Sequence, residues 1–338
     1  MGKNGGLDNI PVTGFASATL FAPLSSYLEL GIGRVEGWLS TTTASMIAQL
    51  LVEQVGAGLR GDVCEIGVHH GRLFLVLANA IVGGDRAVAV DVFDDQQKNI
   101  DHSGQGDRAI FERHLASYAG TADVDIIQES SLDLERLGFL SRRFRFVSID
   151  GGHTGAIVVN DLRLAERTLL PGGIVALDDV LNHHWTGVLS GLAAYVQAGG
   201  TLVPFALVPN KLLLATDAAA AIEGTALMQR HFPLARSKRG MEFLSGTVDI
   251  YDDHPYYSRD GHAGLRLALD DLQRGHDVLA AQLAAAEAEA VRSRREYELK
   301  LAAAEAQVAR LRASTSWRVT APLRTVVTVT RGRGDRQA

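Results

Sequence analysis

The 338-residue sequence predicts an α/β domain, with helices covering both faces of a mainly parallel sheet, followed by a C-terminal coiled-coil helix. Three observations support this fold class. Between about Ser40 and Thr216, short apolar runs rich in β-branched residues alternate with helical stretches, which is typical of parallel sheets. A glycine turn follows the first run. After about residue 264, Ala, Glu, Arg and Leu dominate, with apolar residues in alternating steps of four and three, as in coiled coils.

The individual elements follow from these patterns. The apolar runs predict strands over 61–68, 86–93, 124–130, 144–150, 172–179 and 202–208. The stretches between them predict helices over 73–81, 107–119, 156–170 and 188–197. A further short run, 209–217, predicts a last strand, which we expect to be antiparallel and at an edge of the sheet.

Changes in composition suggest five segments. They are an N-terminal extension (1–39), the α/β domain (40–216), an α+β extension (217–263), the coiled coil (264–313) and a basic tail (314–338). The coiled-coil seam, interrupted once near Arg294, comprises Leu265, Leu269, Leu272, His276, Leu279, Leu283, Ala286, Ala290, Tyr297, Leu301, Ala304, Val308 and Leu311. The many alanines weaken this seam, so a single solvated helix is the alternative.

Bulk composition excludes several classes of protein. A net charge of −6 argues against nucleic-acid binding, and the single cysteine, Cys64, fits a reducing compartment. With no signal peptide and no apolar run of about 18 residues, we expect a cytoplasmic protein. The tail carries five arginines against Asp335 beside an apolar run. It predicts peripheral contact with an anionic membrane, with a disordered tail equally open.

The stretch VCEIGVHHGRL, residues 63–73, contains the glycine turn. Gly67 and Gly71 let the backbone approach a ligand, and the following helix should offer unpaired N–H groups. The first glycine of a dinucleotide fingerprint is replaced by Glu65. A carboxylate would repel a pyrophosphate, but it suits the ammonium and sulfonium of S-adenosylmethionine.

With the pattern E-x-G-x-x-x-G and Asp91 closing the second strand, the sequence resembles the class I S-adenosylmethionine-dependent methyltransferases. The resemblance implies a Rossmann-like sheet and assigns Asp91 to the ribose hydroxyls. Glu65, Gly67, Gly71 and Asp150 would also serve the cofactor, and Ser130 and Ser131 would lie at the adenine edge. Turn and strand-end residues of these types are also common without a ligand.

A second motif places Asp150 at a strand end, His153 three residues later, and Asp178 and Asp179 after the next strand. Together with the LLPGG turn, it resembles the metal-dependent sugar O-methyltransferases of the macrocin type. Three carboxylates at adjacent strand ends would repel one another, so we expect Asp150, Asp178 and Asp179 to bind Mg²⁺. Asp150 and His153 would be catalytic, His153 as general base. Taken singly, such residues are more often surface groups or helix caps.

These patterns predict an O-methyltransferase acting on a sugar or glycan hydroxyl. The ending STSWRVTAPLR resembles those of bacterial glycosyltransferases of surface-polysaccharide assembly, which suggests that pathway and a glycosyltransferase or second copy as partner of the coiled coil. The alternative is a non-catalytic cofactor-binding scaffold. An NAD-linked oxidoreductase is disfavoured by Glu65.

Overall fold

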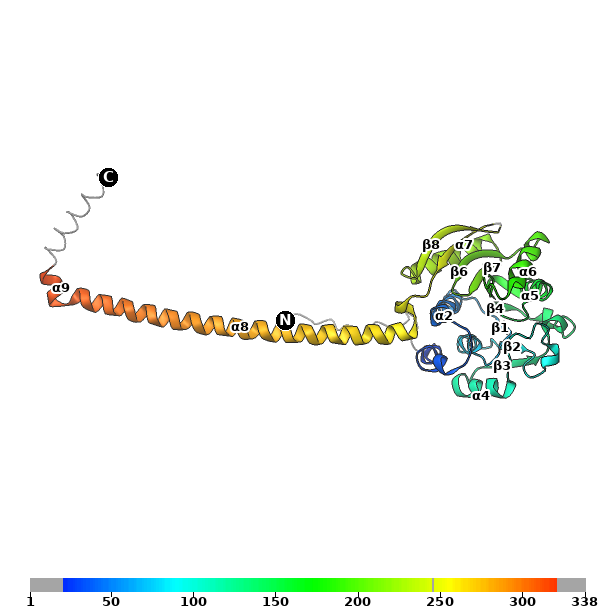
Figure 1. Cartoon of the computed structure of the whole chain (residues 1–338), viewed down its shortest axis with the longest axis horizontal. Coiled ribbons are helices and arrows are strands. Elements are labelled where there is room, and N and C mark those ends of the chain that lie inside the picture. The colour runs from blue at the N-terminus through cyan, green and yellow to red at the C-terminus, as the bar shows by residue number, and fades with distance from the viewer. Residues whose placement is uncertain (1–20, 245, 321–338) are drawn as a thin grey trace. The chain divides into compact units, whose positions relative to one another are not determined.

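The structure is a computed structural model that describes residues 21–244 and 246–320, without the side chains of 259–274 (Figure 1). Three predictions therefore fall partly outside it: the start of the N-terminal extension, the seam residues Leu265, Leu269 and Leu272, and the tail from 321 onward. The chain divides into two compact units, 1–265 and 266–338, which are described separately.

Within the described residues of the first unit, nine strands form one sheet in the order β3-β2-β1-β4-β5-β7-β6-β9-β8. The strands from β3 to β5 along this order are parallel to their neighbours, whereas β7 is antiparallel to both β5 and β6. The strands are β1 (Asp62–Ile66), β2 (Ala87–Asp91), β3 (Val124–Gln128), β4 (Phe144–Ile149), β5 (Leu169–Asp178), β6 (Val203–Val208), β7 (Lys211–Ala215), β8 (Arg236–Phe243) and β9 (Gly246–Tyr251).

This sheet confirms the predicted fold class and the predicted alternation of strands and helices. The expected edge position of 209–217 is wrong, because β7 lies between β5 and β6. Its core, Leu212, Leu213 and Leu214, is fully buried. An unbroken apolar run is typical of a strand covered on both faces, and it was the signal for a central position. Beyond β6, the segment predicted as an α+β extension continues the same sheet through β9 and β8.

Each face of the sheet has its own hydrophobic core. Alternate strand residues supply the two cores, so Val63 belongs to one and Cys64 to the other. The first core includes residues of α2 (Thr41–Gly56), α3 (Phe74–Ala78), α4 (Arg108–Tyr118) and α7 (Ala218–His231), and the second includes residues of α5 (Gly155–Thr168) and α6 (Thr186–Gln197). Figure 1 shows the helices around the sheet. Residues before α2, including Leu24 and Tyr27 of the predicted extension, pack into the first core.

The direction of β7 matters for the site. The parallel strands β1, β2, β4 and β5 all have their C-terminal ends at the same edge of the sheet, which is perpendicular to the strands. Strand β5 ends there at Asp178. Because β7 runs the other way, it begins at that edge, where Lys211 pairs in register with Asp178. The antiparallel strand therefore brings a lysine to the edge where carboxylates gather.

The second unit consists, within its described part, of most of helix α8 (Arg259–Ala313) and of the short helix α9 (Thr315–Val319). Ser314 separates the two helices and caps α9 by accepting the N–H of Trp317. Within the part of the chain that the structure describes, every helix is too short or too polar to cross a membrane.

Candidate active site

A pocket of about 860 Å³ opens at the edge of the sheet where the parallel strands end. Its lining includes Ile66 and Gly67 after β1, Asp91 at the end of β2, and residues of the loops after β4 and β5. The chain moves from β1 to one side for β2 and to the other side for β4. Open α/β sheets bind ligands at such a switch point, so the pocket lies where a cofactor is expected.

The two glycines of the turn are required for different reasons. Gly67 lines the pocket with φ +87°, and a Cβ there would lie 1.8 Å from the carbonyl oxygen of Asp150. Gly71 has φ +91°, and a Cβ there would meet the ring of Phe111 at 2.8 Å. Residues other than glycine rarely adopt such positive φ angles. Gly67 therefore shapes the pocket directly, whereas Gly71 allows the turn to pack on α4.

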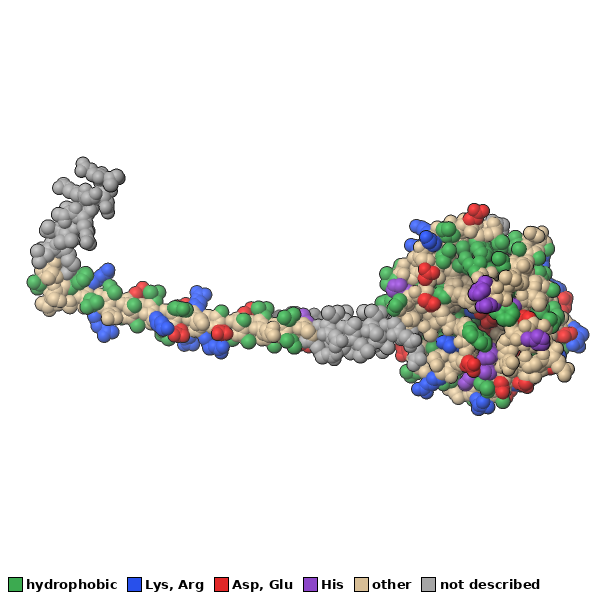
Figure 2. Space-filling model, viewed as in Figure 1, with side chains coloured by type: hydrophobic (Ala, Val, Ile, Leu, Met, Phe, Trp, Pro, Cys, Tyr) green, Lys and Arg blue, Asp and Glu red, His purple; other side chains and the backbone are tan. Residues whose placement is uncertain are grey.

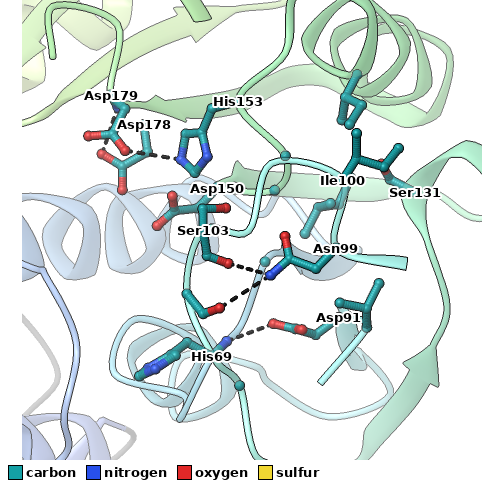
Figure 3. A pocket seen from close by; sticks show the side chains of 18 of the residues that line it. His69, Asp91, Asn99, Ile100, Ser103, Ser131, Asp150, His153, Asp178 and Asp179 are labelled. Carbon is teal, nitrogen blue, oxygen red and sulfur yellow. Dashed lines mark hydrogen bonds and ion pairs between the residues drawn. The ribbon is translucent and has the colours of Figure 1, made fainter. Parts of the chain in front are cut away.

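Asp91 fixes the glycine turn from the end of β2. Its Oδ2 accepts the N–H groups of Val68 at 2.6 Å and His69 at 2.7 Å, and its Oδ1 accepts that of Phe93 at 2.6 Å. Figure 3 shows the contact with His69. The N–H groups of Val68 and His69, in the turn before α3, are therefore used within the chain. Asp91 itself lines the pocket.

Glu65 lies behind the turn and not among the lining residues. It is buried, and within the described residues its Oε2 has no hydrogen-bond partner. Burial raises the pKa of Glu65 well above its usual range, with Lys211 opposing and Asp150 adding to this shift. The carboxyl group therefore lies beneath the glycine turn and does not line the pocket. Ser130 and Ser131, the residues predicted at the adenine edge, both line the pocket.

The motif residues after β4 and β5 converge as predicted, but in a different combination. Ligand atoms of Asp150, His153 and Asp179 all lie within 4.8 Å of one another. Two oxygens on opposite sides of a Mg²⁺ ion are about 4.2 Å apart, so small side-chain movements would bring the carboxylates of Asp150 and Asp179 onto one cation. Carboxylate oxygens are the ligands that a hard divalent cation takes, and the imidazole lies beside them.

His153 is held by two carboxylates and an aromatic ring, and Figure 3 shows its contact with Asp179. Its Nδ1 lies 3.0 Å from Asp101 and its Nε2 lies 3.2 Å from Asp179. The ring of Trp185 stacks on the imidazole, with centroids 4.2 Å apart. Burial lowers the pKa of His153, but the hydrogen bonds to Asp179 and Asp101 outweigh it, and the net pKa is raised. The imidazole is thus oriented for proton transfer.

Asp178, the third predicted metal ligand, has other partners. Its Oδ2 forms an ion pair with Lys211, and its Oδ1 accepts the side-chain N–H of Asn210 at 2.7 Å. Burial raises the pKa of Asp178, and Asp150 raises it further, while Lys211 lowers it. Asn210 also donates to Asp179 at 2.8 Å. The turn between β6 and β7 therefore positions both aspartates, and His153 takes the place of Asp178 in the cluster.

Three site residues were not found from the sequence: Asp101, Asn210 and Lys211. Asp101 lies in an irregular loop whose residues carry no periodic signal, and only the fold brings it to His153. Lys211 did carry a signal. A lysine that opens the apolar strand KLLLA is a buried cation if that strand is central, and a buried cation requires a carboxylate partner.

A comparison with known protein families agrees with this fold. A family model described as a methyltransferase domain matches residues 64–180, from β1 to just beyond β5. With the sheet order, this match defines the first unit as a domain of the Rossmann-like methyltransferase fold. No curated protein sequence matches the chain.

Solved structures with similar folds include three O-methyltransferases. NovP is 12% identical over 53% of this chain and 81% of its own, with a TM-score of 0.41. TomG from Streptomyces achromogenes, involved in tomaymycin synthesis, is 18% identical over 59% and 91%, with a TM-score of 0.39. CalS11, a TDP-rhamnose 3'-O-methyltransferase of calicheamicin biosynthesis, is 14% identical over 59% and 94%, at 0.37. At such scores the likenesses carry no information about substrate.

Proposed function

We propose that the chain is an S-adenosylmethionine-dependent O-methyltransferase that methylates a hydroxyl of a sugar or glycan. The observation that carries the proposal is the imidazole of His153, held between Asp101 and Asp179 inside a pocket at the switch point of a methyltransferase sheet. We place the reaction in the cytoplasm, in bacterial surface-polysaccharide or glycoside biosynthesis. The reason is that the C-terminal sequence resembles those of bacterial glycosyltransferases of surface-polysaccharide assembly.

The charge of the pocket favours S-adenosylmethionine over a dinucleotide. Carboxyl groups of Asp91, Glu129, Asp150, Asp178 and Asp179 line it, against the single lysine Lys98 among the described lining residues. Such a lining attracts an ammonium and a sulfonium and repels a pyrophosphate. Asp91 would bind the ribose hydroxyls, and Ser130 and Ser131 would border the adenine.

His153 supplies the general base in this proposal. Asp101 holds Nδ1–H, so that Nε2 is the nitrogen that receives the proton of the acceptor hydroxyl. The acceptor replaces Asp179 as the partner of Nε2. The hydroxyl oxygen then forms its bond to the methyl carbon as the carbon–sulfur bond breaks, leaving S-adenosylhomocysteine. Positioning of acceptor and cofactor provides much of the remaining acceleration.

Asp150 and Asp179 are the residues that would hold the divalent cation, which we expect to be Mg²⁺. When bound, the cation supplies positive charge that lowers the pKa of an acceptor hydroxyl. Asn210 and Asn182 each donate to Asp179 Oδ1 at 2.8 Å, which fixes this carboxylate in the pocket. Asp178 would support the site without binding the cation, because its ion pair with Lys211 already balances its charge.

Transfer of a labelled methyl group tests the proposal. The purified full chain would be incubated with methyl-labelled S-adenosylmethionine and Mg²⁺, against nucleotide sugars, free glycosides and polysaccharide fragments. Product labelled on oxygen supports the proposal. Tight binding of S-adenosylhomocysteine without turnover on any acceptor would favour the scaffold, and binding of NAD instead would contradict the cofactor assignment.

Glu65→Ala and Asp91→Ala are each expected to weaken S-adenosylmethionine binding at least about tenfold, or about 1.4 kcal/mol. Loss of Asp91 removes the ribose acceptor and also releases the turn, whereas loss of Glu65 removes a carboxyl group beneath it. Calorimetry on the folded variants measures the change. Asp94→Ala is the matched control, since Asp94 is exposed and outside the pocket. Unchanged affinity in both variants would refute the cofactor site.

His153→Ala is expected to lower turnover about 10²-fold, the range for loss of a general base, while binding of S-adenosylhomocysteine is retained. Initial rates of methyl transfer under saturating substrates give the value. His183→Ala provides the control, because His183 is exposed and does not line the pocket. Equal rates in the His153 and His183 variants would show that another group removes the proton.

A further inference from the structure

The described part of α8 presents a row of exposed apolar side chains. Leu279, Leu283, Leu301 and Leu311 are 56–66% exposed, and each occupies a seam position of the heptad pattern. Figure 2 shows apolar side chains interspersed with charges along this helix. Seam leucines left in water are unfavourable, and a partner helix that covers them is the usual solution. The seam therefore predicts a helical partner.

Charges beside the seam indicate which partner fits. The heptad register shifts by four residues at the interruption near Arg294. Before it, Leu283 and Ala290 occupy a positions, with Leu279 and Ala286 at d; after it, Leu301 and Val308 occupy a positions, with Ala304 and Leu311 at d. In a parallel pair of helices, the residue before an a position meets the residue five places later on the partner. For two copies of this chain in register, Lys300 would therefore meet Glu305.

This pair joins opposite charges. Glu305 makes no ion pair within the described part of the chain, whereas Lys300 contacts Glu296 of its own helix. The equivalent positions in neighbouring heptads, Gln282 with Glu287 and Gln307 with Arg312, bring no like charges together. The sequence of one chain is thus complementary to itself in this arrangement.

We propose that the chain forms a homodimer through α8, as a parallel coiled coil in register. This inference is independent of the proposed reaction. In this dimer, the seam of one chain is covered by the seam of a second copy, so the purified chain needs no other protein as partner. The dimer joins two methyltransferase domains through their C-terminal helices.

Two leucines provide a matched test. Leu301 is a seam residue and Leu299 lies two positions away on the opposite face, yet they are 61% and 67% exposed. Light scattering on the full chain should give twice the 36.2 kDa chain mass. Leu301→Asp should shift this to the monomer, while Leu299→Asp should remain dimeric. A monomeric unsubstituted chain, or equal effects of both substitutions, would overturn the proposal.

Cysteine cross-linking tests the register. Leu279→Cys at a d position should form an intermolecular disulfide under mild oxidation, and Ala288→Cys on the outer face should not. The native Cys64 is buried and contributes no background. An antiparallel pair would hold the two copies of residue 279 apart, so a dimer without this cross-link would overturn the parallel arrangement.

The charge pairing has its own readout. Glu305→Lys should raise the dissociation constant about tenfold, since it places like charges at two symmetry-related pairs. Combining it with Lys300→Glu should restore the original value. A double variant as weak as the single one would contradict the proposed pairing.

Discussion

Methyl transfer is expected to stop completely when divalent cations are withdrawn with excess chelator, and to return when Mg²⁺ is added. The carboxylates of Asp150 and Asp179 face His153 with ligand atoms no more than 4.8 Å apart. Without a cation, Asp179 holds the imidazole in an ion pair, and the acceptor hydroxyl has no positive charge to lower its pKa. Initial rates with labelled cofactor, before and after chelation, measure the effect.

Substitution of one ligand should reproduce the loss. Asp179→Asn is expected to lower turnover severely while S-adenosylhomocysteine binding survives, because Asp179 follows β5, whereas Asp91, the residue proposed to bind the cofactor, ends β2. Asp94→Asn, an exposed residue outside the pocket, is the control. Full activity in excess chelator would remove the metal from the mechanism. His153 and its two aspartates would then remove the proton alone.

Lys211→Met is expected to destabilise the fold by about 3–5 kcal/mol, the usual cost of leaving a buried charge without its partner. Lys211 is 2% exposed and forms ion pairs with Asp178 and, at 3.8 Å, with Asp150. Burial alone would lower the pKa of Lys211, but these carboxylates outweigh burial and raise it above its usual range. Urea unfolding, followed by circular dichroism, gives the free energy of unfolding.

Two further variants identify the cause of that loss. Lys238→Met removes an exposed lysine of β8 and should change stability by less than about 0.5 kcal/mol. Adding Asp178→Asn to Lys211→Met should recover part of the loss, since it removes the uncompensated carboxylate. A Lys211 variant as stable as the Lys238 variant would show that Asp178 is neutral without its lysine.

The sequence predicted the sheet because buried parallel strands have a simple composition. Continuous apolar runs such as AVAVD and IVALD are typical of strands that are buried on both faces of a parallel sheet. Parallel strands place their C-terminal ends at the same edge of the sheet. The same reasoning predicted that Asp150, Asp178 and Asp179 would meet beside His153, and the structure brings Asp150, His153 and Asp179 together. Residues that reach the site from regular parallel strands are therefore predictable.

The rest of the site depends on contacts that have no sequence period. Asp101 reaches His153 across 52 positions from an irregular loop. Lys211 and Asn210 reach Asp178 because β7 enters the sheet centrally and in the opposite direction. If the direction of β7 is not known, a metal ion is the obvious source of positive charge for all three carboxylates. In the structure, Lys211 balances the charge of one of them, Asp178.

The central position of β7 also has a consequence for local opening of the fold. Native proteins open in parts, and edge strands exchange their amide hydrogens with solvent sooner than strands flanked on both sides. Strand β8, at the edge, can separate without disturbing Lys211, whereas release of Lys211 requires β7 to part from β5 and β6. The lysine that balances the acidic site is thus anchored in a strand flanked on both sides, and the charge balance persists when the edge strand separates.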